Sequence, residues 1–87
     1  MLSEIRSELL AFLRERAGLD SKFGAETDLV ATNVLDSLLL IDLVLYIERV
    51  FGVALDSSDV TPSNFRSVES LARLVGQYSD ALRRKVA

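Results

Sequence analysis

Apolar side chains recur at helical spacing in three separate stretches of the chain. The first stretch places Ile5, Leu9, Phe12 and Leu13 on one face of a helix. Ser3 is a suitable N-cap for this helix and Gly18 a suitable end. We therefore expect a helix from about residue 4 to about residue 17.

A second helix is predicted from Ser37 to Phe51, with Ser37 or Asp36 as its cap and Gly52 at its end. Its broad apolar arc consists of Leu40, Ile41, Leu43, Val44, Ile47, Val50 and Phe51. Three more leucines, Leu38, Leu39 and Leu45, extend the apolar character around most of the cylinder. A helix of this kind is either central in the fold or keeps part of its surface for a partner.

The remaining segments predict an all-α fold, a small four-helix bundle of three longer amphipathic helices and one short helix. A long first loop, residues 19–36, is anchored by Phe23, Leu29, Val34 and Leu35. One helical turn is expected to start at Pro62, and Ser67 caps the last helix. The last helix has an apolar face of Val68, Leu71, Ala72, Val75, Tyr78 and Leu82. We expect one domain over residues 1–87.

Composition argues against a self-contained enzyme and against a membrane protein. The 87 residues include no His and no Cys, so the usual general base and a thiolate nucleophile are both missing. The longest apolar run, residues 38–41, stops at Asp42, far short of a membrane span. Charged residues near the N-terminus interrupt any signal-peptide core. We therefore expect a cytoplasmic protein.

Negative charge is concentrated in the middle of the chain, although the formal net charge is only −3. Residues 20–59 hold eight acidic and two basic side chains. This acidity disfavours nucleic acid, and the basic residues 83–85 are too few for a specific nucleic-acid site. An acidic middle attracts basic protein partners, or it is simply a solvated face.

The tripeptide Asp36-Ser37-Leu38, at the start of the second predicted helix, is the strongest candidate for chemistry. A serine there presents its hydroxyl outward beside backbone N–H groups, where a phosphate ester would meet the positive end of the helix dipole. The alternative is that the serine is only an N-cap. No base is available to make it the nucleophile of a hydrolase.

The surrounding residues resemble those of the acyl carrier protein family over nearly the whole chain. The similar segments are Thr27-Asp28-Leu29-Val30-Ala31-Thr32-Asn33-Val34-Leu35-Asp36-Ser37-Leu38, Ile47-Glu48, Phe51-Gly52-Val53, Thr61-Pro62, Asn64-Phe65 and Ser67-Val68. Asn33 stands where related carriers often have Gly, and asparagine tolerates the positive φ that such a position needs.

The resemblance implies a carrier rather than a catalyst. A phosphopantetheinyl transferase would move 4′-phosphopantetheine from coenzyme A onto Ser37, and the thiol of that arm would hold acyl groups as thioesters. Such an arm supplies the thiol that the chain itself lacks. The resemblance also implies that Asp36 helps to position the metal-bound coenzyme A of the transferase, with Leu38 beside it.

The same resemblance assigns partner binding to the helix that follows Ser37. It implies that Leu38, Leu39 and Leu45 contact partner enzymes, and that Asp42 and Glu48 orient them electrostatically. For Leu38 and Leu45 the alternative is packing in the core. The partners would be the transferase, an acyl-loading acyltransferase or ligase, and synthase or tailoring enzymes, all acting on a monomeric carrier.

Three residues depart from the carriers of fatty-acid biosynthesis, because Leu39, Arg49 and Val50 make this helix less acidic than theirs. The chain looks more like free-standing carriers of polyketide and related secondary pathways, including those for unusual malonyl-type extender units. Two alternatives remain open. One is a peptidyl or D-alanyl carrier that uses the same serine, and the other is a helical interaction module that carries nothing.

Overall fold

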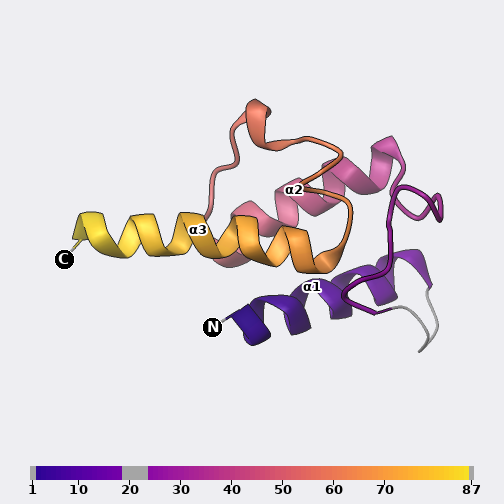
Figure 1. Ribbon diagram of the computed structural model, residues 1–87, viewed down its shortest axis with the longest axis horizontal. Helices are drawn as coiled ribbons and strands as arrows, with labels where there is room; N and C mark the ends of the chain where they lie inside the picture. Colours follow the sequence, from indigo (N-terminus) through magenta and orange to yellow (C-terminus); the bar gives the residue numbers. More distant parts are fainter. Residues whose placement is uncertain (1, 19–23, 87) are drawn as a thin grey trace.

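Three α-helices form most of the chain in the computed structural model, which describes residues 2–18 and 24–86, the last eight for their backbone only. They are α1 (Leu2–Ala17), α2 (Ser37–Phe51) and α3 (Val68–Val86), with the 3-10 turn η1 (Ser57–Asp59) between α2 and α3 (Figure 1). The all-helical prediction is confirmed. Phe23 and the side chains of residues 82–85 lie outside the described residues.

Helix α1 begins earlier than its sequence predicts. It starts at Leu2, so Ser3 lies inside the helix and is not its N-cap. The buried residues Ile5, Leu9 and Leu13 follow the predicted face. Gly18 ends the helix with a φ of 64°, in the left-handed region where glycine has no steric penalty.

Helix α2 has the predicted bounds and both predicted caps. Asp36 is the N-cap, since its side chain accepts a hydrogen bond from the backbone N–H of Leu39. Gly52 is the C-cap with a φ of 67°, and its N–H donates to the carbonyl oxygen of Glu48. The first turn of α2 is thereby fixed by Asp36 rather than by Ser37.

We expect Gly52→Ala to lower the free energy of unfolding by about 1 kcal/mol, because an alanine Cβ is strained at this positive φ. Gly24→Ala is the matched control, since Gly24 also has open space around its Cα but no positive φ. Urea denaturation followed by circular dichroism measures both variants. Equal stability of the two variants would contradict the role of Gly52 as a strained cap.

One apolar core joins the three helices. In Figure 1, α1 and α3 lie side by side and run in opposite directions, and α2 runs diagonally and crosses behind α3. Among the described residues, the largest fully buried side chains are Leu9, Leu13, Leu29, Leu43, Ile47, Leu71, Val68 and Val75. Each helix contributes at least two of these, so the core holds α2 in place against the other two helices.

The described part of the first loop, residues 24–36, is ordered by its apolar anchors, as its length predicts. Leu29 is fully buried, and Val34 and Leu35 pack against the core. The N–H of Leu29 donates to the carbonyl oxygen of Arg66 at 2.6 Å, and the N–H of Leu35 donates to that of Leu29 at 3.0 Å. The loop therefore enters α2 from a fixed direction.

Two short turns lie between α2 and α3. The 3-10 turn η1 covers residues 57–59, and Asp56 caps it in a reciprocal pair with Asp59. Residues 62–65 form a second turn, in which the N–H of Phe65 donates to the carbonyl oxygen of Thr61 at 3.0 Å. This bond closes one helical turn, so the prediction of a helical turn at Pro62 is confirmed, and η1 is an additional short element that the sequence analysis missed.

Candidate functional site

Ser37 is the first residue of α2, and its side chain is exposed. The Oδ1 atom of Asp36 accepts the hydrogen bond from the N–H of Leu39 at 2.8 Å, so the capping role belongs to Asp36. Within residues 2–18 and 24–86, the Ser37 hydroxyl has no hydrogen-bond partner. The oxygen of Ser37 therefore faces water beside the free N–H groups of a helix start.

A tight turn before α2 positions this helix start. The Oδ1 atom of Asp28 accepts hydrogen bonds from the N–H groups of Val30 at 3.0 Å and Ala31 at 2.8 Å. The Ala31 N–H holds the pKa of the Asp28 carboxyl below its ordinary value, and the nearby Arg66 guanidinium adds to that effect. Asn33 closes the turn with a φ of 57°, the conformation that its residue type predicts.

Three apolar side chains of α2 lie exposed in a row, which we call the α2 stripe. They are Leu38, 74% exposed, Ile41, 58% exposed, and Leu45, 51% exposed. Leu38 and Leu45 are therefore surface residues and not core residues. Of the predicted apolar arc, Ile41 and Val50 are exposed, Val50 to 47%, because the core touches only a narrower face of α2.

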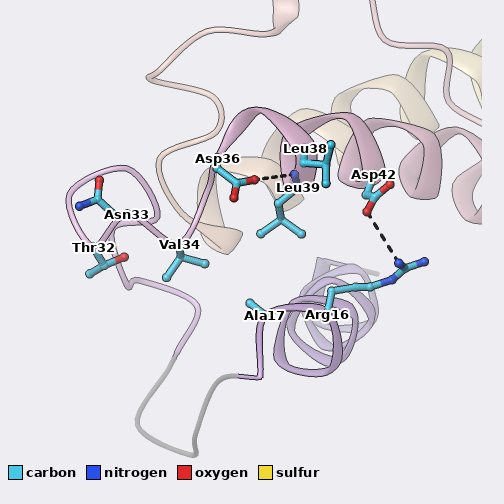
Figure 2. Close-up of a pocket in the computed structure, with 9 residues that line it drawn as sticks. All are labelled: Arg16, Ala17, Thr32, Asn33, Val34, Asp36, Leu38, Leu39 and Asp42. Atoms are coloured by element: carbon cyan, nitrogen blue, oxygen red, sulfur yellow. Dashed lines mark hydrogen bonds and ion pairs between the residues drawn. The ribbon is translucent and has the colours of Figure 1, made fainter.

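Two hollows flank the start of α2. The first is a cleft of about 470 Å³ between α1, the first loop and α2. Figure 2 shows Leu39 pointing from α2 toward α1 into this space, which Leu38 of the stripe also borders. The second is an apolar cavity of about 220 Å³, lined in part by Leu35, Leu40 and Val60. Asp36 and Leu38, the neighbours of Ser37 in sequence, both line the first of these hollows.

The two acids that were predicted to orient partners differ in their surroundings. Glu48 is exposed on the last turn but one of α2. Asp42 forms an ion pair with Arg16 of α1, with 3.7 Å between its Oδ2 and the arginine Nη1 (Figure 2). Arg16 is a contact that sequence reasoning missed, because it joins two helices that are far apart along the chain.

The described residues contain no group of His, Cys, Asp and Glu side chains that could hold a metal ion. None of the helices in the described part of the chain is both long enough and apolar enough to span a membrane.

Comparison with known proteins identifies the kind of chemistry. The model of the family described as "Phosphopantetheine attachment site" matches residues 7–75, most of the chain. The chain belongs to this family. It is also similar to a protein of Serratia sp. named "Probable acyl carrier protein PigG", with 34% identity over 61 residues. That alignment covers 70% of this chain and 66%, just under two thirds, of the relative.

Membership of the phosphopantetheine attachment site family makes the chain a carrier and not a catalyst, as the resemblance implied. Carriers of this family bear a phosphopantetheine arm, are modified by phosphopantetheinyl transferases and serve partner enzymes. The prediction of a phosphopantetheine-bearing carrier is confirmed at this level. The structure adds Ile41, whose spacing from Leu38 and Leu45 could have revealed it as part of the same row.

Proposed function

We propose that the chain is an acyl carrier domain, residues 1–87, that bears its 4′-phosphopantetheine arm on Ser37. The observation that supports this most directly is the division of roles at the start of α2. Asp36 caps the helix, so the exposed Ser37 hydroxyl remains available for esterification. An added phosphodiester would lie at the positive end of the α2 dipole, where an anion is stabilised.

The loading reaction uses the Ser37 oxygen as the acceptor of a phosphoryl group. This oxygen forms a bond to the phosphorus that carries pantetheine, and the phosphoanhydride bond of coenzyme A breaks. Adenosine 3′,5′-bisphosphate leaves, and the hydroxyl proton passes to the transferase. The attached arm supplies a thiol for thioester formation, a group that the Cys-free chain does not contain. Asp36 is exposed next to Ser37, so its carboxylate can also face the metal-bound coenzyme A of the transferase.

We propose acyl cargo of a polyketide or related secondary pathway, with an unusual malonyl-type unit as one candidate. Support comes from the similarity to a probable acyl carrier protein and from Leu39, Arg49 and Val50, which make α2 less acidic. An acyltransferase or ligase would load the arm of this monomeric cytoplasmic carrier, and synthase or tailoring enzymes would use it. The intact mass of the protein from its native host tests this, because an aminoacyl group would instead indicate a peptidyl or D-alanyl carrier.

The attachment itself is tested by mass spectrometry of the purified chain after incubation with coenzyme A and a broad-specificity phosphopantetheinyl transferase. We expect the intact mass to increase by one phosphopantetheine group. Digestion should place the added group on the peptide that contains Ser37. No gain with several active transferases would overturn the carrier proposal and favour a helical interaction module.

We further propose that the α2 stripe is the surface on which partner enzymes dock. We expect Leu45→Glu to raise the KM of the transferase for the carrier about tenfold, equivalent to about 1.4 kcal/mol, by placing a charge in an apolar contact. Stability should change little because Leu45 is 51% exposed. Leu2→Glu is the control, since Leu2 is 40% exposed at the start of α1. A large loss of helicity in Leu45→Glu, or equal KM values for the two variants, would contradict docking at Leu45.

A further inference from the structure

Asp42 lies next to the α2 stripe, but its charge is already compensated within the chain. Its Oδ2 atom is 3.7 Å from Nη1 of Arg16, and this ion pair spans the cleft between α1 and α2 (Figure 2). Both side chains remain partly open to solvent, 56% for Arg16 and 42% for Asp42. A partner that approaches Asp42 therefore meets the guanidinium of Arg16 at the same place.

An aromatic platform orders the Arg16 side chain. Its guanidinium carbon lies 5.5 Å from the centre of the Phe12 ring, a cation–π contact. Phe12 in turn stacks on Tyr46 of α2, with ring centres 4.1 Å apart. The Tyr46 hydroxyl donates to Oε2 of Glu8 at 3.0 Å. Exposed ion pairs contribute little to stability, in part because two mobile side chains must be ordered to form them. Here the Phe12 and Tyr46 rings already hold Arg16 close to Asp42, so less ordering is needed.

We propose that Arg16 determines partner specificity by neutralising Asp42, so that partner enzymes recognise the stripe through an apolar patch and need no cation opposite Asp42. This inference rests on the proposed carrier function and deepens it. It assigns a role to a residue of α1, outside the helix that carries Ser37 and the stripe. It is an alternative to the expectation that Asp42 orients partners electrostatically.

The charge distribution along the stripe supports an apolar partner. Its three exposed members, Leu38, Ile41 and Leu45, offer an uninterrupted apolar row. The exposed Glu48 is followed directly by the exposed Arg49, so acid and base also alternate at the far end of the helix. A cation-rich partner would have to displace Arg16 before it could gain from Asp42. A partner with an apolar patch gains binding free energy by burying the stripe, and the ion pair between Arg16 and Asp42 stays intact.

A double-mutant cycle with the phosphopantetheinyl transferase and coenzyme A as the probe tests this role. The transferase chosen as the probe has a basic carrier-binding face, so it can report whether the charge of Asp42 is available. Arg16→Gln unmasks Asp42, and with this probe we expect the KM for the carrier to fall about two- to fivefold at low salt, the range of an exposed charge contact. This gain should disappear in high salt because exposed charges are then screened. We expect kcat to stay unchanged, and Asp42→Asn to affect KM only when Arg16 has been replaced.

Arg73→Gln is the control, because it removes the same charge from an exposed side chain of α3 while Glu69, its partner, keeps its ion pair with Arg6. Arg73 is 70% exposed, and its Nε atom lies 3.5 Å from Oε1 of Glu69. Circular dichroism should show equal helicity for both variants. Equal KM values for Arg16→Gln and Arg73→Gln would overturn the inference, as would an effect of Asp42→Asn that is equally large with Arg16 present. If the wild-type chain is loaded but the variants give these contrary results, only the role of Arg16 is overturned. If the wild-type chain is never loaded, the carrier function and the role of Arg16 are both overturned.

Discussion

Ser37→Ala abolishes the gain of a phosphopantetheine mass and leaves the helical content of the chain unchanged. The loss should be complete, because the proposed ester needs the Ser37 oxygen and no neighbouring group can replace it. The fold should survive because the side chain is exposed and Asp36, not Ser37, caps α2. Intact-mass spectrometry and far-ultraviolet circular dichroism of the same sample measure the two halves of this prediction.

Ser63→Ala is the control for this experiment, since Ser63 is another exposed serine but lies in a turn rather than at a helix start. It should be loaded like the wild type. If Ser37→Ala still gained the mass, the attachment site would lie elsewhere. If it lost its helicity, then the hydroxyl would have a structural role that the geometry does not show.

Leu43→Ala should lower the free energy of unfolding by about 3 kcal/mol, because its side chain is fully buried between the helices. A domain of this size has a total stability of only about 5–15 kcal/mol, so this loss is severe. Leu45→Ala removes the same atoms two residues later but from a side chain that is 51% exposed. Its effect on stability should stay below about 1 kcal/mol.

Urea denaturation followed by circular dichroism gives both values under identical conditions. Similar losses in the two variants would mean that the α2 stripe is packed rather than free. That result would remove the surface on which both the docking proposal and the role of Arg16 depend. A large difference would support the separation of one helix into a core face and a partner face.

Local patterns were enough to predict much of this fold. The bounds of α2 followed from Asp36 and Gly52, because cap positions depend on the chemistry of one residue and its neighbours. The positive φ of Asn33 was predictable for the same reason. The segment around Ser37 could be recognised because the residues that resemble the acyl carrier protein family follow one another in the same order along the chain.

Contacts between distant segments could not be derived in this way. Periodicity showed that α2 is apolar on most sides, but only the placement of α1 and α3 decides which of these sides stays in water. The apolar arc included both the buried Leu43 and Ile41, which is 58% exposed, and periodicity alone did not separate them. The pairing of Arg16 with Asp42 likewise depends on the crossing of two helices, which spacing along the chain does not encode.

The capping of α2 by Asp36 has a consequence for the working cycle of a carrier. If the Ser37 oxygen were the N-cap of α2, attachment of the arm would remove a hydrogen bond that stabilises the helix. The first turn would then differ between the unmodified and the modified chain. If Ser37 bears the arm as proposed, attachment leaves the capping hydrogen bond of Asp36 in place, and we expect the first turn of α2 to keep its shape. Partner enzymes would then bind the same carrier surface in the bare and the loaded forms, and would distinguish these forms by the tethered group.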